Sequence, residues 1–397
     1  MSDRAGPAGR PLRVAVFSGN YNYVRDGANQ ALNRLVGRML ARGDTLPRVY
    51  APVSKTPAFP PTGDLVPVPS VPIPGRSEYR LGLGLSGRVR ADLEAFAPDL
   101  VHLSAPDLLG HRAKRWAFAR GLPVVASVHT RFETYGDYYG LGWLRGWAED
   151  MLRRFYGDLA EIYAPTEGMA ELLRAGGFSQ RVRIWSRGVD HALFHPGRRD
   201  LGWRRSLGIG DSDFTVGFVG RLVLEKGLDV VAAVDARLRA LGVAHRLLVV
   251  GDGPARAFLE RAAPGAIFTG FLTGEALARA HASADLFLNP SVTETFGNVT
   301  LEAMACGVPV VAADATGSRS LVVDGLTGRL VPAGDVEAFA AAIAAYAGDR
   351  EMAAAHGAAG HARAQAFEWD RVNDAVIDRY ALLVRRESFK SAPAFAT

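Results

Sequence analysis

Residues 291–311 read Ser291-Val-Thr-Glu294-Thr-Phe-Gly-Asn-Val-Thr-Leu-Glu302-Ala-Met-Ala-Cys-Gly307-Val-Pro-Val-Val. Two carboxylates stand eight residues apart in this stretch, which starts as a glycine-containing loop and continues as an apolar helix pattern. Eight residues make just over two turns at about 3.6 residues per turn, so we expect Glu302 near the helix face that adjoins the loop of Glu294. One ligand could then contact both glutamates.

The loop between these glutamates, Phe296-Gly297-Asn298, is predicted to open the helix. Free backbone N–H groups and the positive end of the helix dipole would then face an anion such as a diphosphate. The alternative is a solvated helix N-terminus with a glutamate in its first turn, which is common. The spacing alone leaves both interpretations open.

The rest of the chain alternates short apolar runs with helical patterns, as buried parallel strands and their connecting helices do. In the first half these runs are Val14–Gly19, Leu100–Ser104, Pro123–His129 and Glu161–Pro165. In the second half they are Phe214–Gly220, Arg246–Gly251, Ala266–Gly270, Asp285–Asn289 and Val308–Ala313. The pattern predicts the α/β class, with two doubly wound Rossmann-like domains that bind ligands at the carboxyl ends of their strands.

The length of 397 residues, 48% of them hydrophobic, is sufficient for two cores of ordinary size. We expect an N-terminal domain over residues 1–195 and a C-terminal domain over 196–366, with the polar segment 188–213 at the join. An amphipathic helical pattern over 367–384 follows.

Basic residues are concentrated in the N-terminal half. Residues 1–196 contain 25 Lys and Arg against 18 Asp and Glu, whereas the rest contains 21 against 23. Nucleic acid or an anionic membrane surface would each explain this excess; we expect no nucleic-acid partner and leave peripheral contact with an anionic membrane open.

No apolar run reaches the roughly 18 residues of a spanning helix, and Val14–Gly19 is too short for the core of a signal peptide. The prediction is a cytoplasmic enzyme, with or without peripheral attachment to the inner face of the membrane. The single cysteine, Cys306, excludes an internal disulfide and a cysteine-based zinc site, and is expected to be a small buried hydrophobe.

Two cations follow the first strand of the second half, in the segment Gly220-Arg221-Leu-Val-Leu-Glu-Lys226-Gly227. Arg221 and Lys226 would reach a diphosphate at the strand end and neutralise the charge of a leaving group. The alternative is a pair of surface cations. A possible metal motif, Asp211-Ser-Asp213, precedes a strand instead of following one, so we interpret it as turn chemistry.

Together these segments resemble the retaining glycosyltransferases of the two-Rossmann (GT-B) type, family 4, and most of all its sulfoquinovosyl and glycolipid synthases and its GDP-mannose-dependent mannosyltransferases. The resemblance implies two domains that face a cleft, with the last helix returning to the N-terminal domain. We expect no metal and no cofactor in the reaction, because the sequence offers no plausible metal cluster and supplies its own cations at Arg221 and Lys226.

The resemblance implies a role for each candidate residue. Glu294 would hold the hydroxyls of the donor sugar and Glu302 the ribose, while Arg221 and Lys226 would bind the diphosphate. The catalytic residues would be Glu294, His129, Arg221 and Lys226, and the donor would be bound by Gly27, Arg221, Lys226, Gly251, Phe271, Glu294, Phe296, Gly297, Asn298 and Glu302. Considered without the resemblance, His129 is a polar strand end, and Gly27 and Gly251 are ordinary loop glycines.

The implied reaction transfers a hexose from a UDP- or GDP-linked sugar to an acceptor hydroxyl with retention. We expect a membrane lipid as acceptor, in glycolipid synthesis. The alternatives are a GDP-mannose-dependent α-mannosyltransferase with a soluble or polysaccharide-precursor acceptor and, more distantly, a nucleotide-sugar epimerase.

A stripe at helical spacing carries the lipid hypothesis. It consists of Trp143, Trp147, Met151 and Phe155, with Arg145, Arg153 and Arg154 beside it. Such a face can lie in a membrane interface. An ordinary amphipathic helix that faces a protein core explains it equally well.

Overall fold

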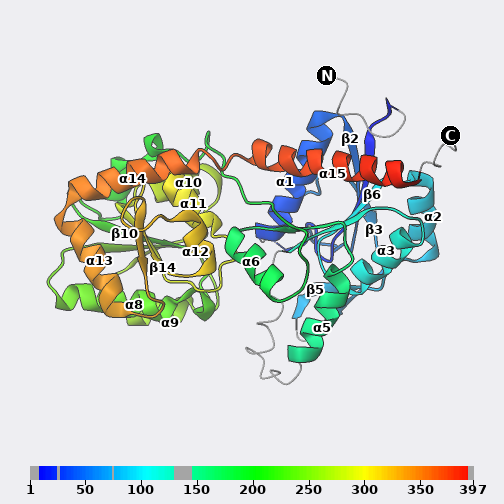
Figure 1. Cartoon of the computed structure of the whole chain (residues 1–397). Coiled ribbons are helices and arrows are strands. Elements are labelled where there is room, and N and C mark those ends of the chain that lie inside the picture. The colour runs from blue at the N-terminus through cyan, green and yellow to red at the C-terminus, as the bar shows by residue number, and fades with distance from the viewer. Residues whose placement is uncertain (1–8, 25–26, 74–75, 129–144, 392–397) are drawn as a thin grey trace. The chain divides into compact units, whose positions relative to one another are not determined.

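The computed structural model describes residues 9–24, 27–73, 76–128 and 145–391, shown in Figure 1. The chain forms two compact units. Unit 1 consists of Met1–Ser186 with Asp370–Thr397, and unit 2 of Arg187–Trp369. The sequence pattern had placed this division after residue 195.

Unit 1 contains a seven-stranded sheet in the order β3-β2-β1-β6-β7-β8-β9, in which every neighbouring pair is parallel. Its strands are β1 (Leu12–Phe17), β2 (Thr45–Ala51), β3 (Asp64–Pro67), β6 (Leu100–Leu103), β7 (Val124–Ser127), β8 (Glu161–Ala164) and β9 (Val182–Ile184). A small antiparallel pair is formed by β4 (Ser70–Ile73) and β5 (Arg76–Gly82). The helices are α1 (Gly27–Arg42), α2 (Gly87–Phe96), α3 (Leu108–Phe118), α5 (Arg145–Tyr156), α6 (Glu167–Ala175) and α15 (Trp369–Ser391).

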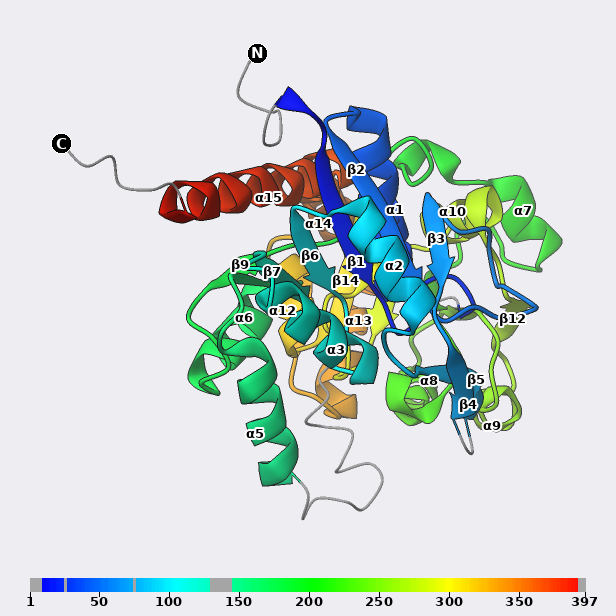
Figure 2. The ribbon, with the colours of Figure 1, turned by 90° about the vertical axis from the view of Figure 1, so that its right-hand side faces the viewer.

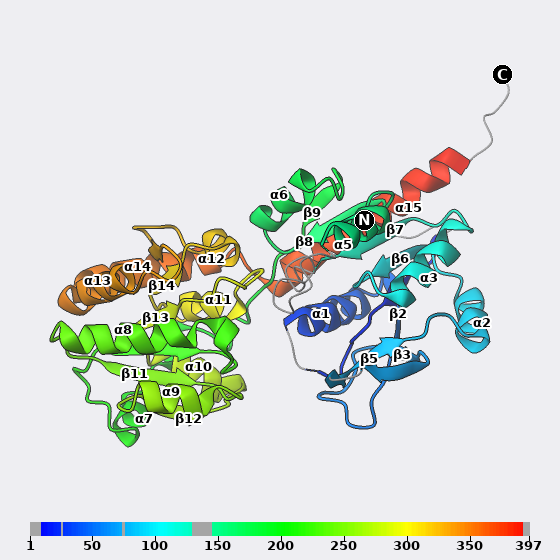
Figure 3. The same ribbon diagram turned by 90° about the horizontal axis from the view of Figure 1, so that it is seen from below.

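Unit 2 contains a six-stranded parallel sheet in the order β12-β11-β10-β13-β14-β15. Its strands are β10 (Thr215–Val219), β11 (Arg246–Val250), β12 (Ile267–Gly270), β13 (Leu286–Asn289), β14 (Val310–Ala313) and β15 (Gly328–Val331). Its α-helices, whose layers can be followed in Figure 3, are α7 (Leu201–Ser206), α8 (Leu228–Ala240), α9 (Arg256–Ala262), α10 (Gly274–Ala282), α11 (Asn298–Ala305), α12 (Thr316–Leu321), α13 (Val336–Gly348) and α14 (Arg350–Ala364). Two 3-10 turns are η3 (Pro196–Arg198) and η4 (Leu224–Lys226).

The α/β fold with two Rossmann-like sheets is therefore confirmed. The apolar runs form central strands because both faces of each sheet are covered, so nearly every side chain is buried, as in β10 and β13. The sequence pattern did not identify β2, β3, β9, β15 or the β4–β5 pair. Several of these lie at sheet edges, where polar and apolar residues mix, as in β9.

In each sheet the strand order reverses beside the first strand of the unit. In unit 1, β1 lies between β2 and β6, and in unit 2, β10 lies between β11 and β13. Ligands of doubly wound sheets bind beyond the carboxyl ends of the strands at this reversal. In unit 2 the reversal places the segment after β10 beside the segment after β13, and these carry Lys226 and Glu294.

The C-terminal helix α15 belongs to unit 1 (red in Figure 1). Successive strand residues face opposite sides of a sheet, and Val101 and Leu103 face a core that also contains side chains of α2 and α3, seen in front of the strands in Figure 2. His102 therefore faces the other side, where Nδ1 lies 2.5 Å from the hydroxyl of Tyr380 on α15. Its Nε2 lies 2.9 Å from Oγ of Ser127.

Further polar contacts fix α15 on the same side of the sheet. Arg379 pairs with Glu161 of β8, whose side chain is 5% exposed. The indole N–H of Trp185 donates to Oδ1 of Asn373 at 3.1 Å. Arg38 of α1 forms an ion pair of 2.6 Å with Asp374.

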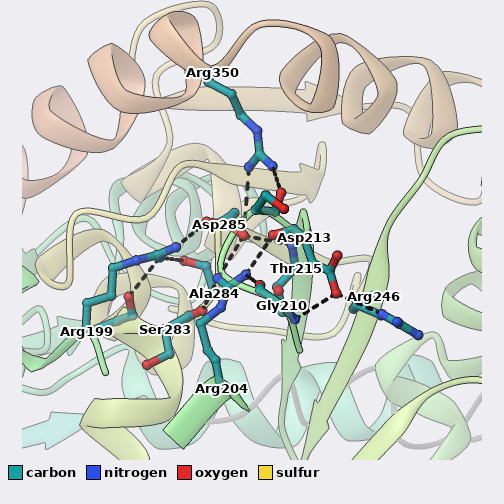
Figure 4. A network of polar contacts seen from close by, with 12 residues as sticks. Arg199, Arg204, Gly210, Asp213, Thr215, Arg246, Ser283, Ala284, Asp285 and Arg350 are labelled. Carbon is teal, nitrogen blue, oxygen red and sulfur yellow. Dashed lines mark hydrogen bonds and ion pairs between the residues drawn. The ribbon is translucent and has the colours of Figure 1, made fainter. Parts of the chain in front are cut away.

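A polar network lies at the end of the unit 2 sheet where β10 and β13 begin, away from the carboxyl ends of these strands. It joins α7 to the two strands (Figure 4). Arg204 is 0% exposed and pairs with Asp285 at 3.0 Å. It also donates to the carbonyl oxygens of Ser283, Gly210 and Asp213. Asp285 accepts the N–H of Thr215 at 2.8 Å, so one carboxylate joins α7 to both strands.

The Asp211-Ser-Asp213 motif lies in this network. The carboxylate of Asp213 accepts the N–H of Gly210 at 2.9 Å and a bond from Arg246 at 3.1 Å, and these contacts hold the pKa of Asp213 below its usual value. Asp211 pairs with Arg205. The interpretation of this motif as turn chemistry is confirmed.

We predict that the buried His102 makes unit 1 sensitive to acid. Burial lowers the pKa of His102 to about 3, whereas an unfolded histidine titrates near 6.5. Between these two pKa values the unfolded chain binds a proton on His102, whereas the folded chain does not. The free energy of unfolding therefore decreases as the pH falls from about 6.5 toward 3. The loss approaches about 1.4 kcal/mol per pH unit.

Denaturant unfolding of the wild type and of His102→Gln between pH 7.5 and 5 measures this effect. The wild type should lose stability more steeply than the variant, because glutamine does not titrate. Parallel pH dependences of the two proteins would contradict the prediction.

Candidate active site

The site in unit 2 begins with an ion pair between residues 68 positions apart. Nζ of Lys226, at the end of η4, donates to Oε1 of Glu294 at 2.5 Å, and the two side chains are 28% and 20% exposed. The fold thus brings together two candidates that the sequence could only place on separate loops. Both charges remain partly accessible to a ligand.

Several hydrogen bonds hold the loop that leads to Glu294. Thr293 donates from Oγ1 to the carbonyl oxygen of Glu225 at 3.3 Å, which ties this loop to η4. At the end of β13, Asn289 accepts the N–H of Ser291 at 3.2 Å and donates to Oγ1 of Thr300 on α11 at 3.0 Å. The loop is therefore connected both to the lysine segment and to the helix that carries Glu302.

Glycine allows the backbone at Glu294 to pack against α12. A Cβ atom at Gly317 would lie 2.6 Å from the carbonyl oxygen of Glu294 and 3.0 Å from its Cβ. Any larger residue would push the loop of Glu294 away from its position. Sequence analysis did not single out Gly317, because nothing in its local pattern reports this approach.

The candidate Gly251 has a structural role. Its φ is +140°, and a Cβ there would lie 1.9 Å from the carbonyl oxygen of Gly220. A Cβ at the following Gly253 would lie 2.4 Å from the carbonyl oxygen of Leu222. The loops after β10 and β11 therefore touch backbone to backbone, beside the exposed Arg221.

Helix α11 begins at Asn298 with Gly297 as its N-cap. Gly297 has φ +100° and provides no side-chain hydrogen bond to the first turn. The side chain of Phe296 is 4% exposed and packs 6.0 Å from the ring of Phe367. A contact between Phe296 and a ligand would therefore involve its backbone.

Glu302 lies one turn before the end of α11 and faces a histidine that the sequence analysis missed. Its Oε2 lies 3.3 Å from Nε2 of His281 on α10. The neighbouring Cys306 is 3% exposed, as expected of a buried hydrophobe, and burial together with the charge of Glu302 raises the pKa of its thiol to about 12. No sequence motif identifies His281, because its contact with Glu302 forms only when α10 packs beside α11.

Phe271, after β12, is 67% exposed, so its ring is available to stack on a planar group. In unit 1, Gly27 is the first residue of α1, after the loop that follows β1. That loop is held by Tyr21, which donates to Thr62 at 2.6 Å, and by Tyr23, which donates to Gly19 at 2.7 Å.

His129 and Trp143 lie outside the described residues, as does the side chain of Trp147. The structure corrects the stripe at Phe155, which is 1% exposed and packs edge-on against His111 with ring centroids 4.7 Å apart. Phe155 is a core residue because α5 turns it toward α3. Arg153 pairs along its own helix with Glu149 and Asp150.

Within the described ranges, no group of three or more His, Cys, Asp or Glu side chains is arranged to hold a metal ion. No helix in the same part of the chain is long and apolar enough to cross a membrane. The unit 2 site instead offers two cations, two partly exposed carboxylates and an uncapped helix N-terminus. Such a set suits a ligand with both hydroxyl groups and anionic oxygens.

Comparison with known families extends over most of the chain. Residues 25–193 match the family described as Glycosyltransferase Family 4, and residues 213–349 match the family described as Glycosyl transferases group 1. A GDP-mannose-dependent alpha-mannosyltransferase of Mycolicibacterium smegmatis is 34% identical over 389 residues, which cover 96% of this chain and 100% of that protein. The sulfoquinovosyl transferase SQD2 of Arabidopsis thaliana is 33% identical over 76% of this chain and 60% of its own length.

Solved structures share the fold. A sucrose-phosphate synthase of Thermosynechococcus elongatus superposes with a TM-score of 0.73 at 21% identity, over 96% of this chain and 100% of that one. HepE of Anabaena in complex with UDP-glucose superposes with a TM-score of 0.71 at 20% identity, over 94% and 100% of the two chains.

Proposed function

Because this chain belongs to glycosyltransferase family 4, we propose that it transfers a mannosyl group from GDP-mannose to an acceptor hydroxyl with retention of configuration. Transfer of a sugar from a nucleotide sugar is the activity of the family. The choice of mannose and guanine rests on the full-length similarity to the Mycolicibacterium enzyme, whose name states that donor. This proposal is narrower than the expectation from sequence alone, which left UDP- and GDP-linked donors open.

The ion pair of Lys226 with Glu294 is the observation that supports this chemistry most directly. A lone carboxylate at Glu294 would repel the diphosphate of the donor. The adjacent ammonium group of Lys226 offsets this repulsion and is itself attracted to the phosphate. Glu294 is then free to accept hydrogen bonds from sugar hydroxyls and to fix the ring. Arg221 and the N–H groups at 297–298 add further positive charge on the phosphate side.

In the proposed reaction the bond between the anomeric carbon and the diphosphate oxygen breaks, and the acceptor oxygen bonds to the same face of the sugar. The acceptor proton passes to the departing diphosphate. The negative charge that develops on the leaving group is met by Lys226 and Arg221, so no metal ion is required. The roles of Gly27 and His129 in donor binding stay predictions that come from the resemblance to the family alone.

The choice of donor and the independence from metal are tested together by measuring the release of GDP from GDP-mannose when a cell extract that contains the acceptor is added. We predict turnover with GDP-mannose that exceeds turnover with UDP-glucose, and full activity in EDTA because the protein supplies its own cations. An absolute requirement for Mg²⁺ or Mn²⁺ would contradict metal independence. Conversion of the free nucleotide sugar to an isomer without acceptor would indicate an epimerase instead.

Substitution of the two glutamates should affect GDP binding and turnover differently. Glu302→Ala should weaken binding of GDP by about 1.5–3 kcal/mol, because it removes a charge-assisted hydrogen bond to a ribose hydroxyl. Glu294→Ala should leave GDP binding nearly intact and lower kcat, because its partner is the sugar. Calorimetry with GDP and steady-state kinetics measure both effects, and equal losses of GDP affinity in the two variants would refute the assignment.

We propose a membrane lipid as acceptor and a place for the enzyme on the cytoplasmic face of the membrane. The support is the basic excess of residues 1–196 and the exposed Arg154 on α5. Each basic side chain near anionic headgroups contributes about 1 kcal/mol. Because Phe155 is buried, the basic side chains support a membrane contact more strongly than the aromatic stripe does.

The protein should therefore co-sediment with phosphatidylglycerol vesicles and be released toward molar salt, where the screening length falls to about 3 Å. Arg154→Glu should weaken vesicle binding. The matched change Arg261→Glu, at an exposed arginine of α9 in unit 2, should not. A wild type that ignores these vesicles at low salt would favour a soluble or polysaccharide-precursor acceptor.

A further inference from the structure

His281 occupies an apolar niche that gives an imidazole little hydration. It lies at the end of α10, and its side chain is 1% exposed. The ring centroids of Phe194 and Phe287 lie 5.9 Å and 5.7 Å from its own. A polar ring in such surroundings is costly unless it has a partner.

The partner that the structure offers is Glu302. Nε2 of His281 and Oε2 of Glu302 are 3.3 Å apart and both are covered from solvent. Among the described residues neither atom has a hydrogen-bond partner in good geometry, so each is the nearest available partner of the other. The Glu302 side chain as a whole keeps 22% exposure, so its exposed part is not Oε2. One carboxylate oxygen therefore faces inward to the histidine while the rest of the group stays open to a ligand.

From this geometry we infer that His281 positions Glu302 for the ribose of the nucleotide, by donating a hydrogen bond from Nε2 to Oε2. The inference rests on the proposed function, because it needs Glu302 as the ribose ligand. His281 does not touch the nucleotide itself; it acts through the carboxylate. Site hydrogen bonds are often long without ligand and tighten when the complex forms.

The energetic reason is preorganisation. A free glutamate side chain samples several rotamers, and ordering it on binding costs conformational entropy. A histidine that holds one oxygen in the folded protein removes part of that cost before the nucleotide arrives. The nearby thiol of Cys306 does not compete for Oε2, because it is directed to the carbonyl oxygen of Ala278 at 3.8 Å.

Calorimetry with GDP on single and double variants tests the inference. His281→Phe keeps an aromatic ring between Phe194 and Phe287 and should weaken GDP binding about three- to tenfold. His281→Gln, whose amide can reach Oε2, should restore most of the affinity, whereas the shorter His281→Asn should not. KM for the donor should rise more than kcat falls, because the ribose is remote from the reacting carbon.

A thermodynamic cycle separates positioning from a merely structural role. Combining His281→Phe with Glu302→Gln should weaken binding little beyond Glu302→Gln alone. The matched control His356→Phe removes a histidine that bonds Tyr346 at 2.7 Å in the same unit, and should leave GDP affinity as in the wild type.

Wild-type affinity in a folded His281→Phe or His281→Asn would overturn the inference, as would full additivity in the double variant. If Glu302→Gln itself binds GDP as tightly as the wild type, the ribose assignment in the proposed function fails first, and this inference fails with it. Weak binding by Glu302→Gln together with normal binding by both His281 variants would refute the positioning role alone.

Discussion

The buried ion pair between Arg204 and Asp285 is the constraint on which the rest of unit 2 depends. Asp285 lies immediately before β13 and also accepts the N–H of Thr215, the first residue of β10, so it fixes the register of the two strands whose far ends carry the site. Removing one partner from such a buried pair costs about 3–5 kcal/mol, because the other charge is left without compensation. The position of Glu294 beside Lys226 follows from this register, although neither residue touches the pair.

Close backbone packing transmits that register to the ligand side of the sheet. Glycines at 251, 253 and 317 let loops approach to distances at which a Cβ atom would overlap a carbonyl oxygen. Such close approaches leave these loops little room to rearrange, so Lys226 and Glu294 keep their arrangement before any ligand binds. Preorganised charge of this kind stabilises a leaving group without a cost of rearrangement at the moment of reaction.

Unit 1 depends on a different device, because its last helix comes from the opposite end of the chain. His102 and Glu161, on strands β6 and β8, meet Tyr380 and Arg379 of α15. Buried polar contacts are specific in direction, so they select one position for α15 where an apolar face alone would allow several. The burial that accompanies these contacts lowers the pKa of His102 and makes unit 1 less stable in acid.

The sequence by itself determined the fold class, the strands at the centre of both sheets and the separate segments that hold Glu294, Glu302, Arg221 and Lys226, because burial and strand ends leave local patterns of apolar residues and glycines. Only the tertiary structure decided which of these segments touch. In the folded chain Lys226 pairs with Glu294, and Phe155 lies in the core. Gly251 allows two loops to pack closely, and His281 lies beside Glu302. Those contacts join residues on different elements, and a local pattern reports how deeply a residue is buried but not which distant residue it will meet.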